Sequence, residues 1–346
     1  MRFLVVLIVI LIGVPAFVYE PVAVERKERL SEFAFFTGKL ADLTPADDVI
    51  PYDVNTPLFS NYAEKLRFIK LPAGEVAHYR DSLAFDFPVG TILIKNFYYP
   101  VDFRKPDGPR KIIETRLLVH QPGGWEAWPY VWNDDQSDAV YDPAGDIKKI
   151  SYVAKNGRRK EVTYAVPNKN QCKGCHVRNE SLLPIGVNAR QLNRDFNYGD
   201  SKENQLMHWK ALGVLSGLPD KDAIPALAVW DNPATGSLDQ RARAYLDANC
   251  GHCHSQNGPA STSGLFLDIF EQRKIHLGVD KTPVAAGRGA GNLRFDIVPG
   301  KPDQSILVFR MKTNDPAIAM PELGREQVHA EGVALIEEWI RSESFN

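Results

Sequence analysis

The four cysteines of this 346-residue chain all lie in two copies of one five-residue pattern, Cys-x-x-Cys-His. Two thiols at this spacing can bond the two vinyl groups of one porphyrin, while the adjoining histidine ligates its iron. The pattern therefore predicts two covalently bound haem c groups, each with one axial protein ligand. The predicted attachment residues are Cys172, Cys175, Cys250 and Cys253, and the predicted iron ligands are His176 and His254.

The same residue types could instead hold zinc, because cysteine pairs and histidines supply the sulfur and nitrogen ligands of structural zinc sites. In such sites a longer stretch usually separates the cysteine pair from its histidine, whereas His176 and His254 follow the second cysteine directly. Disulfide pairing would not explain why the histidine recurs at the same position. The pattern favours haem over both alternatives.

The N-terminus has the pattern of an export signal. Arg2 precedes an apolar run over residues 4–19, and Ala16 is a small residue at a plausible cleavage site. The run is also close to the lower length of a membrane-spanning helix. We expect either a cleaved signal peptide or an uncleaved anchor that tethers the chain to the inner membrane. Export agrees with haem c, which proteins acquire outside the cytoplasm, and predicts a location in the periplasm.

The charge balance argues against a nucleic-acid partner. The chain has 41 basic and 43 acidic residues, a net charge of -2, and no basic block. Its length is sufficient for two domains, each with its own core.

Residues 48–167 have the pattern of β-strands. Residues 87–99 are rich in β-branched and aromatic side chains and are bounded by prolines. Residues 111–121 alternate, which predicts one face that packs and one that lines something polar. The first face would hold Ile113, Thr115, Leu117 and Val119, and the second Glu114, Arg116 and His120.

A hairpin is predicted immediately before the first motif. Asn156-Gly157 separates two strand patterns, residues 150–153 and 162–166, and predicts a two-residue turn with positive φ at both positions. The second strand runs almost directly into Cys172, so we expect a sheet to deliver the first motif. The nearby Trp125, Trp128 and Trp132 are expected to pack in the core.

Candidates for a second ligand of the first haem are few. A helix is predicted over residues 202–212, and it contains Met207 and His208. These two residues are the first candidates, followed by His120 and His78. Packing or surface roles are the alternative for all four.

The C-terminal part has helical patterns at residues 238–248 and 332–341, before the second motif and at the end of the chain. Met320 stands just before the last helix and is the predicted sixth ligand of the second haem, since thioether sulfur favours ferrous iron. Met311 lies in an apolar run and is predicted to be core.

The order helix, haem motif, loop, helix is that of class I cytochrome c. We therefore predict an α+β chain, with an N-terminal β-sheet domain that carries the first haem motif, followed by an all-α class I cytochrome c domain. The predicted division is residues 1–19 as signal peptide or anchor, 20–47 as linker, 48–218 as the β-rich domain, 219–235 as a proline-rich linker and 236–346 as the class I domain.

Residues 80–180 resemble the β-sheet mono-haem cytochromes, which comprise the lysine-cross-linked hydroxylamine-oxidising family and the cytochromes c-prime-beta. The segments that carry this resemblance are "FPVGTILIK", "ETRLLV" and "GGWEAWPYVW", followed by the first motif. The resemblance implies an open distal side, with His176 as the only protein ligand of the first haem. It also makes Lys95 the position to test for a cross-link; the alternative is a solvated strand lysine.

From residue 30 onward the chain resembles a family of uncharacterised proteobacterial dihaem c-type cytochromes, some fused to quinoprotein dehydrogenase-like propellers. The segments include "VIPYDVNTPLFSNYAEKLRFIKLPAG", "NQCKGCH", "GVNARQLNRDFNY", "NCGHCHSQNGPASTSGLFLD" and "VPGKPDQSILVFRM". This resemblance implies a dihaem redox protein of the cell envelope whose partner is a quinoprotein dehydrogenase or another cytochrome.

Three functions follow from these patterns. The first is a non-catalytic electron carrier with two haems. The second is a haem enzyme or gas-binding protein whose open first haem receives electrons from the second. The third is a structural subunit of a quinoprotein dehydrogenase. The coordination number of the first haem separates the first two.

Overall fold

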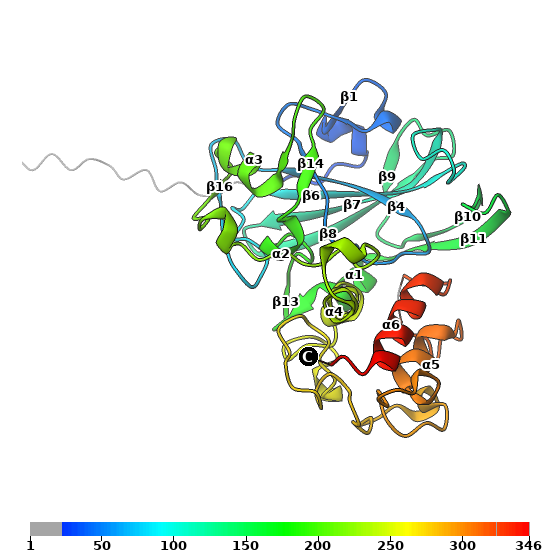
Figure 1. The fold of residues 1–346 in the computed structure, drawn as a ribbon. Helices are drawn as coiled ribbons and strands as arrows, with labels where there is room; N and C mark the ends of the chain where they lie inside the picture. Colours follow the sequence, from blue (N-terminus) through cyan, green and yellow to red (C-terminus); the bar gives the residue numbers. More distant parts are fainter. Residues whose placement is uncertain (1–22, 323, 346) are drawn as a thin grey trace, which may run out of the picture.

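The structure is a computed structural model that describes residues 23–322 and 324–345 (Figure 1). The predicted signal peptide or anchor, residues 1–19, lies outside the described residues. Within them, the helices are all too short or too polar to cross a membrane.

A six-stranded antiparallel sheet forms the centre of the N-terminal part (Figure 1). Its strand order is β3-β4-β6-β7-β8-β9, so neighbours in the sheet are near neighbours in the sequence. The strands are β3 (Ile50–Tyr52), β4 (Glu64–Lys70), β6 (Ile92–Pro100), β7 (Arg110–Gln121), β8 (Gly124–Trp132) and β9 (Ala139–Tyr141). The strand predictions for residues 87–99 and 111–121 are confirmed by β6 and β7.

Both faces of the sheet are covered, which explains why β6 and β7 contain so many apolar residues. Ile94, Leu117 and Trp128 pack on one face, and Leu93 and Leu118 pack on the other. The predicted alternation of β7 holds from Glu114 to His120. It fails at Ile113, which packs with the residues of the opposite face, because the register shifts between Phe97 and Tyr98.

The segment expected to be a linker, residues 20–47, includes residues that pack on the first face of the sheet. Leu30, Phe35 and Leu43 are buried there with the strands of the sheet. Two strands, β1 (Phe36–Thr37) and β2 (Thr44–Pro45), form a small sheet of their own.

The predicted hairpin before the first motif is present as β10 (Asp146–Val153) and β11 (Arg159–Val166). Its turn differs from the prediction. Ala154 accepts a hydrogen bond from Gly157 and donates one to Arg158, and only Gly157 takes a positive φ, of 79°. The chain thus uses a three-residue loop with glycine in the left-handed conformation.

Short elements cover the second face of the sheet (Figure 1). They are β5 (Ala77–His78), α1 (Lys169–His176), β12 (Val177–Arg178), β13 (Ser181–Leu182), α2 (Ala189–Leu192), β14 (Asp195–Asn197), β15 (Lys202–Asn204), α3 (Gln205–Ala211) and β16 (Leu215–Ser216). The helix predicted over residues 202–212 begins three residues later, because Asn204 caps it and residues 202–204 pair with β14.

The C-terminal part is not the predicted all-α class I cytochrome c domain. The described residues of the whole chain include only six short α-helices, of which three lie here: α4 (Leu238–Leu246), α5 (Ile306–Lys312) and α6 (Ala330–Ser342). Residues 264–301 contain neither an α-helix nor a named strand. Gly278 and Gly291 take positive φ, which does not suit a helix. An added Cβ at these positions would lie 2.9 and 2.5 Å from neighbouring side chains.

Helices α4 and α6 pack directly against each other around Gly332. A Cβ at Gly332 would lie 2.3 Å from the hydroxyl oxygen of Tyr245, so only glycine permits this approach. Trp339 and Ile336 of α6 are fully buried in the same core. The helical predictions at residues 238–248 and 332–341 are confirmed, although the domain that they were expected to frame is not.

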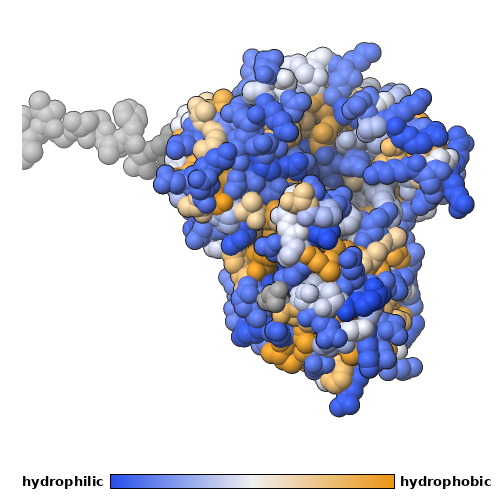
Figure 2. All heavy atoms as spheres, in the orientation of Figure 1, coloured by the Kyte–Doolittle hydropathy of each residue, from blue (hydrophilic) through white to orange (hydrophobic). Residues whose placement is uncertain are grey.

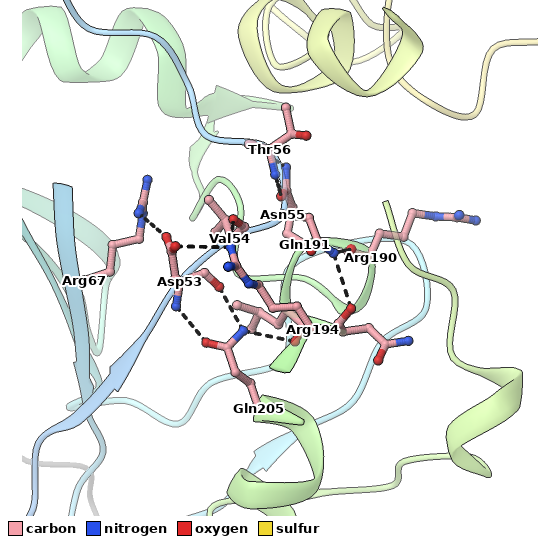
Figure 3. Close-up of polar contacts among 11 residues, drawn as sticks. Asp53, Val54, Asn55, Thr56, Arg67, Arg190, Gln191, Arg194 and Gln205 are labelled. Carbon is pink, nitrogen blue, oxygen red and sulfur yellow. Dashed lines mark hydrogen bonds and ion pairs between the residues drawn. The ribbon is translucent and has the colours of Figure 1, made fainter. Parts of the chain in front are cut away.

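Two buried glutamine side chains hold residues 53–56 against the segments that follow the first motif (Figure 3). Gln205 accepts a hydrogen bond from the backbone N–H of Asp53 at 2.7 Å and donates to its carbonyl oxygen at 2.9 Å. Gln191 makes the same pair of bonds to Thr56, at 2.9 and 3.0 Å. Each glutamine amide forms the two backbone hydrogen bonds that a neighbouring strand would otherwise supply.

We expect Gln205→Leu to lower the free energy of unfolding by roughly 2–4 kcal/mol, because it leaves the partly buried N–H and C=O of Asp53 and the buried carbonyl of Leu192 without this partner. Urea unfolding followed by circular dichroism measures the change. Gln272→Leu is the matched control, since Gln272 is exposed and its side chain makes no hydrogen bond to the described residues. Equal stabilities of the two variants would contradict the role of Gln205.

Candidate functional site: two cysteine-histidine motifs at one junction

The first motif forms the helix α1. Its start is fixed by a capping box, in which Asn168 accepts from the N–H of Gln171 at 2.8 Å and the Gln171 side chain accepts from the N–H of Asn168 at 2.9 Å. The strand β11 ends only two residues before this cap. The sheet therefore delivers the motif, as predicted, but the motif itself is helical.

The ring of His176 is oriented by a backbone contact. Its Nδ1 lies 2.9 Å from the carbonyl oxygen of Leu183, so Nδ1–H donates and Nε2 is left as the basic nitrogen. Burial lowers the pKa of His176 to about 4, against the opposing effect of the Leu183 carbonyl. The imidazole is therefore neutral at pH 7, the form that ligates a metal. Such a backbone partner for the second nitrogen is usual for metal-binding histidines.

A large cavity opens beside the first motif. It has a volume of about 270 Å³, is partly open to solvent, and is lined by Cys172, Cys175 and His176. This volume lies near the lower end of the roughly 300–1,000 Å³ of ordinary small-molecule pockets. Its remaining walls come from the sheet, from the segments 54–61, 82–84 and 178–191, and from residues 247–270 of the C-terminal part.

The cavity is thus placed at the junction of the two parts of the chain. Figure 1 shows α1 and α4 at this junction, below the sheet. On the face shown in Figure 2, the upper part is largely hydrophilic, and apolar atoms gather near the middle and at the lower edge.

The sheet contributes two different rows of side chains to the cavity. One row is cationic: Arg67, Lys95 and Arg116 lie directly opposite one another on β4, β6 and β7. The next row on the same face is apolar and is formed by Ile69, Leu93, Leu118 and Ala127. The wall is therefore amphipathic, with its apolar and charged halves separated along the strands.

Lys95 differs from the two arginines beside it. Arg67 forms an ion pair with Asp53 at 2.6 Å, and Arg116 binds the carboxylate of Glu114 at 2.5 and 2.8 Å. Lys95 forms no ion pair or hydrogen bond with the described residues, and its Nζ lies 5.0 Å from a phenylalanine ring centroid. Burial, then the charge of Arg67 and other nearby cations, holds the pKa of Lys95 well below its usual value.

The second motif lies in the π-helical turn Asp247–Gly251 that continues α4 and in the residues after it. Cys250 faces a much smaller cavity, of about 20 Å³, which Met311 and Met320 also line. His254 is not among the residues that line this cavity. Burial lowers the pKa of His254 to about 4, and its Nδ1 lies 3.4 Å from the Ser263 hydroxyl.

The two motifs touch each other. The Sγ atoms of Cys175 and Cys253 and a ring nitrogen of His252 all lie within 4.8 Å of one another. The thiol of Cys253 lies 3.6 Å from the carbonyl oxygen of Gly174. A hydrogen bond from Cys253 lowers the pKa of Cys175, and the same bond raises the pKa of Cys253.

Further polar contacts join the segments that follow the two motifs. Arg178 donates to the hydroxyl of Ser255 at 3.2 Å, and the N–H of Asn179 donates to the carbonyl of Asn257 at 3.4 Å. The sequence predicted both motifs but gave no reason to expect them side by side.

The four residues considered as a second ligand of the first haem all lie outside the lining of the large cavity. The described lining does not include His78, His120, Met207 or His208. Each histidine has another partner for Nδ1: the Ser216 hydroxyl, the Phe87 carbonyl and the Glu203 carboxylate, respectively. Met207 packs against the apolar core.

Several cavity residues were not found from the sequence. Arg67 could have been found, because residues 64–70 alternate and place it on the same strand face as Ile69. Arg178 lies in the two-residue strand β12 and Arg190 in the four-residue helix α2, and elements this short give no such signal. The side-chain Nε atoms of both arginines are buried and have no hydrogen-bond partner.

Comparison of this chain with protein-family models, curated proteins and solved structures finds no match.

Proposed function

We propose that this chain is a dihaem c-type cytochrome that passes electrons between two closely placed haems and onward to a redox partner protein. The observation that carries the proposal is the contact between the two motifs, in which the Sγ atoms of Cys175 and Cys253 lie within 4.8 Å. Electron transfer between cofactors requires short separations of their edges. Attachment of one haem to each of these sulfurs would place two haem edges next to each other.

The residues of the first site suit a covalent haem. Cys172 and Cys175 face the same cavity as His176, and the tautomer of His176 leaves Nε2 as the ligating nitrogen. When bound, the haem would supply a one-electron iron couple. The chain would hold the His176 ring in place through the Leu183 carbonyl, and the sheet would present an amphipathic wall to the haem.

The residues of the second site suit a haem less completely. Cys250 and Met320 face the same cavity, so the thioether is available on the side of the attachment residue. His254 is buried and neutral at pH 7, as a ligand must be. Cys253 points toward the first motif. This direction favours two haems that meet at the junction over two haems that lie far apart.

Zinc explains less of the arrangement. Cys175, His252 and Cys253 form the only cluster of at least three potential metal ligands among the described residues, and structural zinc sites almost always have four protein ligands. A zinc ion there would also leave Cys172, Cys250 and both motif histidines without a role.

A second candidate function is a haem enzyme or gas-binding protein. The observation that favours it is the lining of the large cavity, which contains no methionine and whose only histidines are His176 and His252. His252 belongs to the second motif, beside the attachment residue Cys175. The iron at the first site would then lack a sixth protein ligand.

We expect the purified protein to carry two covalent haems by intact-mass measurement. The double variant Cys172→Ala, Cys175→Ala should carry one haem, and so should Cys250→Ala, Cys253→Ala, because each motif supplies both thiols for its own porphyrin. Zinc at one equivalent and no added haem mass would show that the cytochrome proposal is wrong.

The two methionines at the second site should respond differently. Met320→Ala should lower the midpoint potential of the second haem, because ferrous iron loses its thioether ligand. Met311→Ala should lower the free energy of unfolding by about 2–5 kcal/mol, because Met311 is only 5% exposed, and should leave the potential unchanged. Potentiometric titration and urea unfolding of both variants measure the effects, and the opposite pattern would assign the ligand to Met311.

The first haem should bind carbon monoxide when reduced, because the described cavity lining offers its iron no methionine and no histidine outside the two motifs. Absorbance spectra of the reduced protein, with and without carbon monoxide, measure this binding. The variant that lacks Cys250 and Cys253 is the control that isolates the first haem. A six-coordinate, unreactive first haem would exclude the enzyme or gas-binding function and favour the electron carrier.

A further inference from the structure

Three basic side chains lie directly opposite one another in the wall of the large cavity. Strand pairing that serves the fold alone would not be expected to bring them together. Like charges directly opposite one another in a sheet are destabilising, yet Arg67, Lys95 and Arg116 occupy three neighbouring strands in register. Arg67 is largely buried, with a side chain that is 7% exposed. Burial increases the cost of such repulsion.

Only part of this charge is compensated within the protein. Asp53 and Glu114 neutralise the two arginines, whereas Lys95 between them has no anionic partner among the described residues. The cavity wall also contains Arg178 and Arg190, each with an unpartnered buried Nε.

The acidic residues of the cavity lining already accept hydrogen bonds from backbone N–H groups. The described lining contains only two carboxylates, Asp247 and Asp268, and both belong to the C-terminal part. Each accepts a backbone hydrogen bond, from Ile269 at 2.9 Å and from Phe270 at 3.1 Å, respectively. Lys95 is therefore the one basic side chain of the row without an anionic partner among the described residues, and an anion beside it would stabilise its charged form.

We propose that the cationic row binds an oxyanion, with Lys95 as its principal contact. The apolar row beside it suits the flat body of a ligand, and the cationic row suits a carboxylate or a small inorganic oxyanion at its edge. Two sources have this chemistry: a propionate of the first haem and a free oxyanion that enters the cavity. The first source rests on the proposed function, and the second does not.

The test compares Lys95→Met with Lys149→Met in the full-length holoprotein. Lys149 is an exposed lysine on β10 and forms no ion pair with the described residues, so it controls for the loss of a strand lysine. Lys95→Met should fold, because it removes a like-charge contact from the sheet. Lys95→Arg keeps the charge and should keep the binding.

The first arm titrates the protein with sodium formate by calorimetry. A free-oxyanion site predicts binding that Lys95→Met weakens roughly 10- to 100-fold, which corresponds to the loss of one hydrogen bond to a charged group. The double variant Cys172→Ala, Cys175→Ala removes the first haem and should retain this binding. This variant excludes ligation of the first iron as the cause and keeps the result independent of the cytochrome proposal.

The second arm measures the midpoint potential of the first haem as a function of pH. A propionate contact predicts that formate does not bind. It also predicts that in Lys95→Met the propionate ionises at higher pH, because the carboxylate loses its cation. The pH at which the potential changes would move upward with it. Lys149→Met should show neither effect. The proposal is overturned if Lys95→Met and Lys149→Met behave alike in both arms.

Discussion

The antiparallel register of β4, β6 and β7 is the constraint on which the site depends. Because side chains alternate between the two faces of a strand, this register places the apolar row of Leu93 and Leu118 and the cationic row of Lys95 on the same side. A slip of one residue would turn both rows away from the cavity. The opposite face is fixed by the buried Ile94 and Leu117, so packing of the core also sets the chemistry of the cavity wall.

The second constraint is the junction between the sheet and the C-terminal helices. The helix α1 follows the β10-β11 hairpin and presents the first motif to the end of α4, which carries the second. Contacts such as Arg178 to Ser255 and Phe59 to Asn249 hold the two parts together. The proposed electron transfer depends on this junction rather than on either part alone.

Local patterns predicted the parts of the fold that local interactions determine. Alternation identified β6 and β7, and helical periodicity identified α6. The predicted two-residue turn at Gly157 and the predicted face of Ile113 were wrong, because loop length and a shift of register depend on the partner strand. The prediction of an all-α C-terminal domain was also wrong. It rested on the order of the helices and the haem motif, whereas the residues between the helices form loops. The approach of Cys253 to Gly174 joins residues 79 positions apart and has no local signal.

The environment of Cys172 and Cys250 has a consequence for how the proposed cytochrome would be assembled. Cys172 is 8% exposed, and burial raises the pKa of Cys250 to about 12, so the folded chain offers little access to a reactive thiolate at either residue. If the chain is the proposed cytochrome, covalent attachment of the porphyrins at these two residues would have to occur while the polypeptide is still open. Closure of the junction would come afterward, with the prosthetic groups acting as a template for the final assembly.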